Sequence, residues 1–424
     1  MSKVAYYFNK EVGNFYYGPY HPMKPFRMKI THEMLKAYGV LPKFNHIIPE
    51  EHPEFVSKID FTNFHSDEYI NFLMTVSPEN MNQMTEQLLY YSIGEDCPVF
   101  EGLGDFCRIS GTGSLLGAHY INEGWSKTSI NWSGGLHHAK RSEAVGFCYL
   151  NDCVLAILEL LTRHQRVLYI DIDVHHGDGV EEAFFCTDRV MTCSFHKFGD
   201  YFPGTGSIND VGYGKGKYYA VNCPCYEGMD DISVEYVFKK TIDNIVEKFK
   251  PEAIVLQGGT DSLSGDRLGC FNLSIKGHSI GVRHVKTLGI PFMMLGGGGY
   301  TLRNVPRAWT YESGLALGIE LEDQMPKHDY LGYFYPEYKL HMPVSNMENV
   351  NTPEYLNSIL EQIDNHLKNI HISNPDFNLN EGWTDPSIVK DFNPKDNEQE
   401  YIDKHPDEKY NEENSVPLNK VNEL

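Results

Sequence analysis

The stretch VLYIDIDVHHGDG, residues 167–179, joins an apolar run of strand length to a cluster of acidic and imidazole side chains. We interpret Val167 to Asp173 as a buried strand of a parallel sheet, because it is short and largely apolar. It follows a helix-like segment, Val154 to Leu161, whose entry carries the capping residue types Asn151 and Asp152. A strand that follows such a helix indicates an α/β protein.

Three further strand-like segments repeat this pattern: Arg189 to Phe195, Ala253 to Gln257 and Pro291 to Leu295. The alternation predicts one large domain, residues 1–374, with a central parallel sheet flanked by helices. Sheets of this kind bind ligands on the loops at the carboxyl ends of their strands. Candidate ligand-binding residues occur at these ends: Asp171, Asp173, His175, His176 and Asp178 after the first strand, Asp261 after the third, and Gly296 to Gly299 with Tyr300 after the fourth.

The amino-acid composition limits the kinds of molecule that the protein is expected to bind and the compartment in which it is expected to occur. The 424 residues carry a formal net charge of −22, so direct binding to nucleic acid is not expected and basic partners are favoured. Nine cysteines in no regular framework indicate a reducing compartment. Met1 to Asn9 has no leader pattern, and no stretch reaches about 18 consecutive apolar residues, so we expect neither secretion nor a membrane span.

The C-terminal segment differs in composition from the rest. From about Pro375 the chain is rich in Asn, Asp, Glu, Lys and Pro and poor in apolar residues. Burial of so little apolar surface does not offset the entropy lost on ordering. We therefore expect residues 375–424 to form a flexible acidic tail that keeps the protein soluble, with specific docking as the alternative.

The stretch IDIDVHHGDG, Ile170 to Gly179, places carboxylates and imidazoles together at a strand end. Buried carboxylates need a cation or several hydrogen bonds. An Asp-x-His pair at such a place offers one oxygen and one nitrogen to a divalent metal ion. Taken alone, the stretch is equally compatible with a surface turn whose side chains are all hydrogen-bonded.

A second imidazole pair, His137 and His138 in SGGLHHAK, lies in a glycine-rich loop. Adjacent imidazoles held by carboxylates titrate as a coupled unit with one proton near neutrality, which suits acid/base catalysis, although such a pair can be incidental. GGTDSLSGDR, Gly258 to Arg267, adds an acidic residue, and LGGGGY ends in a tyrosine. No nucleotide-binding glycine fingerprint is present in the sequence.

Together these motifs resemble the class I histone deacetylases, which have the arginase/deacetylase fold. The resemblance extends from about Lys3 to about Ile370. Its blocks, in order, are YYGPYHPMKP, GEDCPVF, GGLHHAKRSEAVGFCYLND, VLYIDIDVHHGDGVEEAF, SFHKFGDYFPGTG, SLSGDRLGCFNLSIKGH and MLGGGGYT. It implies a metal-dependent amidohydrolase that deacetylates lysine side chains of histone tails, in chromatin modification and transcriptional repression.

The resemblance implies that Asp173, His175 and Asp261 bind one zinc ion. Three protein ligands leave a coordination position open, as catalytic zinc requires. Two carboxylates and one imidazole also suit ferrous iron, and the sequence does not choose between the two metals.

The same resemblance implies the catalytic roles. His138 is expected to be the general base and His137 its electrostatic partner. Asp178 and Asp171 are expected to orient these two imidazoles, respectively. The Tyr300 hydroxyl is expected to stabilise the oxyanion that forms during amide hydrolysis.

A narrow aromatic tube is implied for the acetyl-lysine side chain. Phe147 and Phe202 flank it, Gly146 permits close approach, and Leu268 lies at the rim. Burial of the lysine methylenes at about 0.8 kcal/mol each contributes roughly 3 kcal/mol. Outside the tube, Asp96 matches the family's rim aspartate, which accepts hydrogen bonds from the substrate backbone.

The resemblance further implies sites for ions. Arg27 matches an arginine of the product channel, where it would attract acetate. Lys24, Arg267 and Arg303 match positions that bind an inositol phosphate in corepressor complexes. Tyr20, however, stands where the family usually has glycine, and its ring would obstruct the phosphate. Two potassium sites are expected, one at Asp171, Asp173, His175, Ser194 and Phe195, the other at Phe184, Thr187, Val190 and Tyr219.

Other interpretations stay open. QGGTDSL departs from the family's usual pattern at Gly258 and Thr260, which changes the packing beside Asp261. The resemblance implies residence in the nucleus, with the cytoplasm as an alternative. Alternative functions are a two-manganese ureohydrolase of the same fold, a polyamine or non-histone deacetylase, and a catalytically silent corepressor scaffold.

Overall fold

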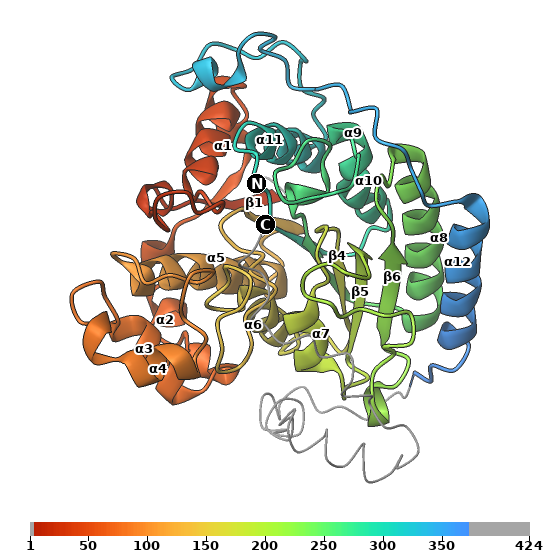
Figure 1. The fold of residues 1–424 in the computed structure, drawn as a ribbon, viewed down its shortest axis with the longest axis horizontal. Helices are drawn as coiled ribbons and strands as arrows, with labels where there is room; N and C mark the ends of the chain where they lie inside the picture. The colour runs from red at the N-terminus through yellow and green to blue at the C-terminus, as the bar shows by residue number, and fades with distance from the viewer. Residues whose placement is uncertain (1–3, 373–424) are drawn as a thin grey trace, which may run out of the picture. The chain divides into compact units, whose positions relative to one another are not determined.

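One all-parallel sheet of eight strands organises residues 4–372, the part of the chain that the computed structural model describes (Figure 1). The strand order is β2-β1-β3-β8-β7-β4-β5-β6. The strands are β1 (Val4–Tyr7), β2 (Asn45–Ile47), β3 (Thr128–Asn131), β4 (Val167–Asp171), β5 (Val190–Lys197), β6 (Ala220–Cys225), β7 (Ala253–Gln257) and β8 (Phe292–Leu295). The predicted α/β architecture with a parallel sheet is confirmed.

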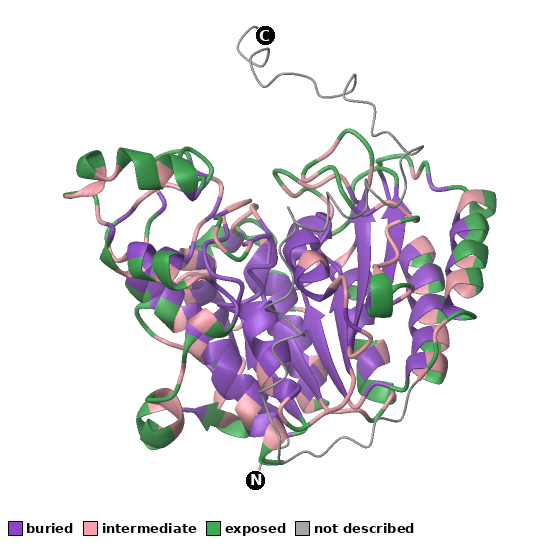
Figure 2. Cartoon of the chain, turned by 90° about the horizontal axis from the view of Figure 1, so that it is seen from below, coloured by how far each residue is buried: buried purple, intermediate pink, exposed green. Residues whose placement is uncertain are grey.

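The four predicted strands are β4, β5, β7 and β8, and their ends agree with the predicted ends to within two residues. Every residue of these strands is buried. Such burial is the physical reason that β4, β7 and β8 show continuous apolar runs instead of alternation. Figure 2 shows the consequence, a buried sheet with exposed residues on the outer faces of the helices.

Helices cover both sides of the sheet (Figure 1). α5 packs on α6 and contacts β1, β3 and β8, whereas α10 contacts β8 and α8, and α12 packs on α8. The Asn151 side chain accepts a hydrogen bond from the Val154 amide and caps α6, as its residue type predicted. The helices are α1 (Phe26–Ala37), α2 (Pro53–Val56), α3 (Asp67–Thr75), α4 (Thr85–Tyr90), α5 (Leu103–Asn122), α6 (Asp152–Leu160), α7 (Asp178–Phe184), α8 (Asp231–Phe249), α9 (Ile275–His278), α10 (Ile280–Thr287), α11 (Asn304–Leu317) and α12 (Pro353–Leu367).

The strand order brings distant motifs to one place. β3, β8, β7 and β4 are consecutive neighbours in the middle of the sheet. The loops after them carry the His137–His138 pair, the Gly296–Tyr300 segment, Asp261, and the Asp173–His175 motif, respectively. Because parallel strands end at the same edge, all four motifs meet at the carboxyl end of the sheet.

Two further expectations concern cysteines and membranes. None of the nine cysteines forms a disulfide. Among residues 4–372, no helix combines the length and the apolar character needed to cross a bilayer. The predicted tail, residues 375–424, lies outside the described residues, and the boundary at residue 374 stays a prediction.

A buried histidine fastens the loop that follows β3. The His65 Nδ1–H donates to the Arg141 carbonyl at 3.1 Å, and its Nε2 accepts from the Asn151 amide at 3.0 Å. The Asn151 side chain in turn donates to the carbonyls of His137 and Ala139. Burial lowers the pKa of His65 to about 4. His65 is therefore neutral in the folded protein, with both ring nitrogens engaged.

His65 is expected to make stability depend on pH. Its folded pKa of about 4 lies below the unfolded value of about 6.5, so the unfolded chain binds the additional proton and stability falls as the pH drops through this window. Between pH 7 and pH 5 the expected loss from this group is about 2 kcal/mol. The free energy of unfolding, measured in urea at both pH values, should therefore fall less in His65→Gln than in the wild type. An equal fall in the two proteins would contradict the assignment.

Candidate metal centre and active site

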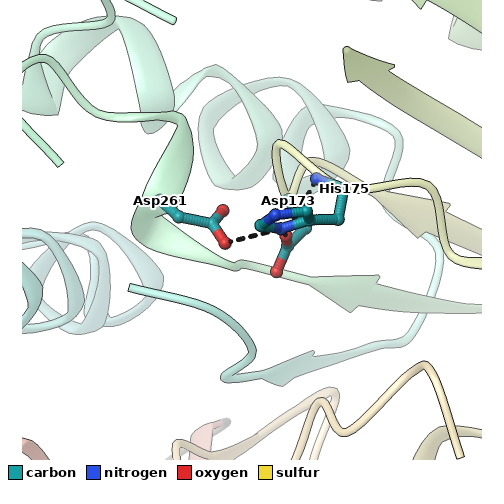
Figure 3. Close-up of side chains that lie close together, drawn as sticks. All are labelled: Asp173, His175 and Asp261. Carbon is teal, nitrogen blue, oxygen red and sulfur yellow. Dashed lines mark hydrogen bonds and ion pairs between the residues drawn. The ribbon is translucent and has the colours of Figure 1, made fainter. Parts of the chain in front are cut away.

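Three buried side chains from two loops meet at the carboxyl end of the sheet. Asp173, His175 and Asp261 each offer a ligand atom within 4.8 Å of the others. His175 Nδ1 lies 3.0 Å from Asp173 Oδ1 and 3.1 Å from Asp261 Oδ2. Figure 3 shows the imidazole and the two carboxyl groups pointing toward one another. The structure therefore brings together the three residues that the sequence proposed as metal ligands.

Hydrogen bonds fix the outward oxygens of both carboxylates. Asp173 Oδ2 accepts from Gln257 Nε2 at 3.0 Å and from the Gly298 amide at 2.8 Å. Asp261 Oδ1 accepts from the Val174 amide at 2.9 Å. Asp173 Oδ1 and Asp261 Oδ2 consequently face the shared space and His175 Nδ1. Such orientation by surrounding donors is characteristic of metal ligands.

Close approach of the loops depends on glycine. A Cβ atom at Gly259 would collide with the Asp173 carboxylate, and one at Gly298 would collide with the Asp261 carboxylate. The loop after β7 and the loop after β8 can therefore enclose the carboxylates only because neither position carries a side chain.

The electrostatics of the cluster favour a positive charge at its centre. Burial raises the pKa of Asp261, and the neighbouring charge of Asp173 raises it further, to about 7. For His175, burial opposes protonation, but hydrogen bonds to Asp173 and Asp261 outweigh it and raise the pKa to about 10. The Nδ1 proton of His175 thus lies between two carboxylate oxygens. A divalent cation with oxygen and nitrogen ligands fits the same position, so the donor set suits zinc or ferrous iron.

Two histidine–aspartate pairs lie beside this centre. His137 Nδ1 is 2.7 Å from Asp171 Oδ2, and His138 Nδ1 is 2.7 Å from Asp178 Oδ1. The two imidazole centroids are 3.9 Å apart. Since each Nδ1–H donates to a carboxylate, each Nε2 faces away from its aspartate. The His137 Nε2 lies 3.7 Å from Asp173, so this pair borders the metal centre directly.

Burial lowers the pKa of His138, and the neighbouring His137 lowers it further, to about 3. Burial also disfavours protonation of His137, but the Asp171 and Asp173 carboxylates outweigh it and raise its pKa to about 9. The two neighbouring imidazoles therefore differ in protonation, and His138 is the neutral one.

Aromatic rings lie beside the residues of the centre. Phe202 contacts the His138 ring edge-on at 5.0 Å between centroids, and Phe147 contacts the Tyr300 ring at 5.6 Å. Gly146, at φ +54°, leaves no room for a Cβ between His138 and Phe202. Burial, followed by the charge of Asp261, raises the pKa of Tyr300 well above its usual value, so its hydroxyl keeps the proton.

The rim residues are more exposed. Phe202 is 44% and Leu268 36% exposed. Asp96 is exposed, and its carbonyl accepts a hydrogen bond from His21 Nε2 at 3.1 Å. The His21 ring in turn contacts Phe147 edge-on. Ring contacts link Phe202 to His138 and His175 and link Phe147 to Tyr300 and His21, and the tube and rim stay predictions.

Comparison with known proteins gives a consistent result. Residues 21–315 match the histone deacetylase domain. The chain is 55% identical over 366 residues to histone deacetylase 1 of Homo sapiens, covering 86% of this chain and 75% of that protein. It is 56% identical over 368 residues to histone deacetylase clr6 of Schizosaccharomyces pombe, covering 87% and 90%. A probable histone deacetylase 1-A of Xenopus laevis is 56% identical over 366 residues, with 86% and 75% covered.

The chain belongs to the histone deacetylase family. Its similarity to histone deacetylase 1 proteins supports membership of class I, and the resemblance drawn from the motifs is confirmed.

The arginine expected in the family's product channel is buried and supports the glycine loop. Arg27 donates from Nη1 to the Gly299 carbonyl at 2.7 Å and from Nη2 to the Gly297 carbonyl at 2.6 Å. Its guanidinium lies over the Trp309 ring at 5.0 Å. The buried Nε atom has no hydrogen-bond partner among residues 4–372, so one donor remains for an anion.

The first expected potassium site shares Asp173 and His175 with the metal ligands, whereas the other positions expected to bind ions are not among those ligands. Ser194 and Asp171, two residues expected at the first potassium site, pair across β4 and β5, whereas Val190, expected at the second, begins β5 at the opposite end. Lys24 lies over the Tyr16 ring at 5.2 Å. Arg267 and Arg303 are exposed, and Tyr20 is 90% exposed at φ +65°. Potassium and inositol phosphate binding stay predictions.

Several site residues were not assigned from the sequence. Gln257 hydrogen-bonds Asp173, and its signal was a polar residue closing an apolar strand. His278 binds Glu312 at 2.6 Å and the Gly259 carbonyl at 2.8 Å, which supports the loop of Asp261. Glu312 lies 34 residues from His278 in the sequence, so no local pattern could reveal this pair.

Removal of one ligand should abolish tight metal binding. Asp261→Asn replaces an anionic ligand oxygen by a neutral amide, so bound zinc should fall from about one ion per chain to well below that after dialysis. Elemental analysis measures the metal content. Asp105→Asn, which changes an exposed carboxylate on α5, serves as the control and should retain the metal. Equal zinc content in Asp261→Asn and the wild type would contradict the assigned site.

Proposed function

We propose that this chain is a metal-dependent amidohydrolase that removes acetyl groups from acetyl-lysine side chains, with histone tails as substrates. The observation that carries the proposal is the convergence of Asp173, His175 and Asp261 with the His137–His138 pair and Tyr300 at one end of the sheet. The names of the similar proteins, which are histone deacetylases, support the same activity.

Asp173, His175 and Asp261 would hold one zinc ion, and ferrous iron also suits these ligands. When bound, such an ion supplies a Lewis acid that polarises the acetyl carbonyl and acidifies a water molecule. Two structural potassium ions at the positions predicted above are part of the proposal.

His138 acts as the general base in this proposal. Its Nδ1–H is committed to Asp178, so Nε2 is the nitrogen that accepts a proton. Its lowered pKa keeps the imidazole neutral near pH 7, which a base requires. His137, held by Asp171, provides electrostatic support beside it.

Tyr300 is the proposed oxyanion stabiliser. Its raised pKa keeps the phenol protonated and able to donate a hydrogen bond to the substrate oxygen as negative charge develops there. Arg27, with its buried Nε donor, is proposed to attract the acetate product.

The proposed aromatic tube favours one class of substrate. The rings of Phe147 and Phe202, with Gly146 packed against His138 and Phe202, suit an extended aliphatic chain that carries a neutral amide. Leu268 is proposed to lie at the rim of the tube, and Asp96 is proposed to accept hydrogen bonds from the backbone of the peptide. A formal net charge of −22 favours basic tails as partners.

Membership of the histone deacetylase family supports a proposal for the cellular location and partners of the protein. We expect action in the nucleus, in transcriptional repression and within corepressor complexes. Lys24, Arg267 and Arg303 are the proposed contacts for an inositol phosphate, although the exposed Tyr20 ring stands where it would obstruct the approach. Residues 375–424 are proposed to be a separate acidic tail.

Hydrolysis of an acetyl-lysine histone peptide tests the activity. The wild type should hydrolyse the peptide, lose activity with a chelator, and recover with zinc. Tyr300→Phe should lower kcat by on the order of a hundredfold or more, since one oxyanion donor is lost. Tyr236→Phe, which removes a hydroxyl on α8 bound to Asn357, is the matched control and should keep full activity.

The outcomes separate the alternatives. A wild type that turns over acetylpolyamine but not the peptide would indicate a polyamine deacetylase. No turnover of either compound by the zinc-loaded protein would favour a silent scaffold. Equal rates for wild type and Tyr300→Phe would remove Tyr300 from the mechanism.

Asp96 should affect peptide binding more than chemistry. Loss of a charge-assisted hydrogen bond of about 1.5 kcal/mol predicts a KM about tenfold higher for the histone peptide in Asp96→Asn, with kcat little changed. A minimal acetyl-lysine substrate that lacks flanking peptide bonds should show no such change. Glu95→Gln alters the adjacent exposed carboxylate and is the control. A KM that is equal in Asp96→Asn and the wild type would exclude the contact.

A further inference from the structure

A largely buried lysine contacts the aspartate that holds the general base. Lys140 lies two residues after His138 in the loop that follows β3. Its Nζ is 2.6 Å from Asp178 Oδ2 and 2.9 Å from Glu182 Oε2, and its side chain is only 17% exposed. A lysine ammonium ion with little access to water requires such paired carboxylates.

The Asp178 carboxylate has two partners, one at each oxygen atom: the His138 imidazole and the Lys140 ammonium. Its Oδ1 accepts from His138 Nδ1 at 2.7 Å, while its Oδ2 contacts Lys140. With one oxygen fixed on each side, the carboxylate plane cannot rotate without breaking one of the two contacts. The orientation of the Asp178 carboxylate therefore depends on Lys140 as much as on His138.

Lys140 also connects the loop of His138 to the helix that carries Asp178. Asp178 and Glu182 are four residues apart on α7, so they lie on the same face of the helix. The Lys140 ammonium bridges both. It offsets the repulsion between these carboxylates and fixes the distance between the imidazole and its aspartate.

The His137–Asp171 pair is held in place by other groups. Asp171, which orients His137, accepts from the Tyr169 hydroxyl at 2.6 Å and from the Asp173 amide at 3.1 Å. A phenol and a backbone amide thus orient the Asp171 carboxylate, whereas an ammonium ion orients the Asp178 carboxylate. The two imidazoles are adjacent in sequence but differ in the groups behind their aspartates.

We propose that Lys140 is a positioning residue for the general base, acting through Asp178 on the orientation and tautomer of His138. This inference rests on the proposed function, since it takes His138 as the base. Lys140 itself does not touch the substrate. Its effect is on the proton-transfer step, so it changes kcat and leaves the binding of the peptide unchanged.

The kinetic test compares Lys140→Met with Lys140→Arg. Methionine retains much of the length and apolar stem but removes the charge, so kcat should fall at least tenfold with KM within about twofold of the wild type. Arginine restores a cation and should return kcat to within about threefold. Glu182→Gln removes the second partner but keeps the Lys140–Asp178 contact, so it should retain most of the activity. If Lys140→Met does not fold, Lys140→Gln replaces it.

A double-variant cycle separates positioning from general stability. If Lys140 acts through Asp178, then Lys140→Met should cause little further loss of kcat in an Asp178→Asn background. The same tenfold loss in both backgrounds would overturn the proposal, as would an unchanged kcat in Lys140→Met.

A spectroscopic measurement tests the inference independently of activity. In protein with ¹⁵N-labelled histidine, the His138 resonances, assigned by their absence in His138→Gln, should report a fixed Nδ1–H tautomer. Lys140→Met should convert it to a mixture of tautomers. Unchanged His138 shifts would overturn the proposal even for a chain that hydrolyses no acetyl-lysine, whereas an inactive wild type with the predicted shifts would overturn only the proposed function.

Discussion

The structure of the site depends on the burial of two carboxylates that face the same small space. Asp173 and Asp261 are both fully buried, and the ligand atoms of the triad lie within 4.8 Å of one another. Two unit charges at this distance repel by about 3.5 kcal/mol at an effective dielectric constant of 20. The imidazoles of His137 and His175 outweigh the effect of burial and hold the pKa of Asp173 well below its usual value, whereas the pKa of Asp261 is raised. A centre with this charge distribution is completed by a cation.

Backbone amides as well as side chains stabilise these two buried carboxylates by donating hydrogen bonds to them. The amides of Val174 and Gly298 donate to the outward carboxylate oxygens, and Gln257 adds a side-chain donor. These donors come from the loops after β4 and β8 and from the end of β7. Because β8, β7 and β4 are consecutive in the sheet, their ends are close enough for one loop to satisfy the carboxylate of another. Strand order therefore determines whether the two aspartates can be buried together.

Sequence patterns predicted four of the eight strands, β4, β5, β7 and β8, and missed β1 although VAYY is apolar and buried. β4 and β7 were clear because VLYI and AIVL are continuous apolar runs. β2 and β3 were missed, since NHI and TSIN are short and polar although they pair within the sheet. β6 was missed for another reason: Pro224 argues against a strand, and it is tolerated because β6 is at the edge of the sheet.

The candidate site also has a part that the sequence predicted and a part that it could not predict. Motifs supplied the metal ligands, because an acidic and imidazole-rich strand end is chemically unusual. They could not supply the contacts between loops, which depend on the order of strands in space. Lys140 illustrates the difference, since it stands within the quoted motif SGGLHHAK but its partners Asp178 and Glu182 are on α7. Only the packing of that helix against the loop gives the lysine a role.

The contrast between the two histidines follows from the same packing. His137 lies between the carboxylates of Asp171 and Asp173, so negative charge on both sides favours its protonated form. A cation held by Asp173 would weaken that effect from one side and leave Asp171 to act from the other. His138 instead faces one carboxylate, and Lys140 already compensates the charge of that group. Burial then dominates at His138, and the neutral imidazole that results is the form that can accept a proton. Two identical side chains, adjacent in the sequence, thus acquire different chemistry from the charges placed behind them.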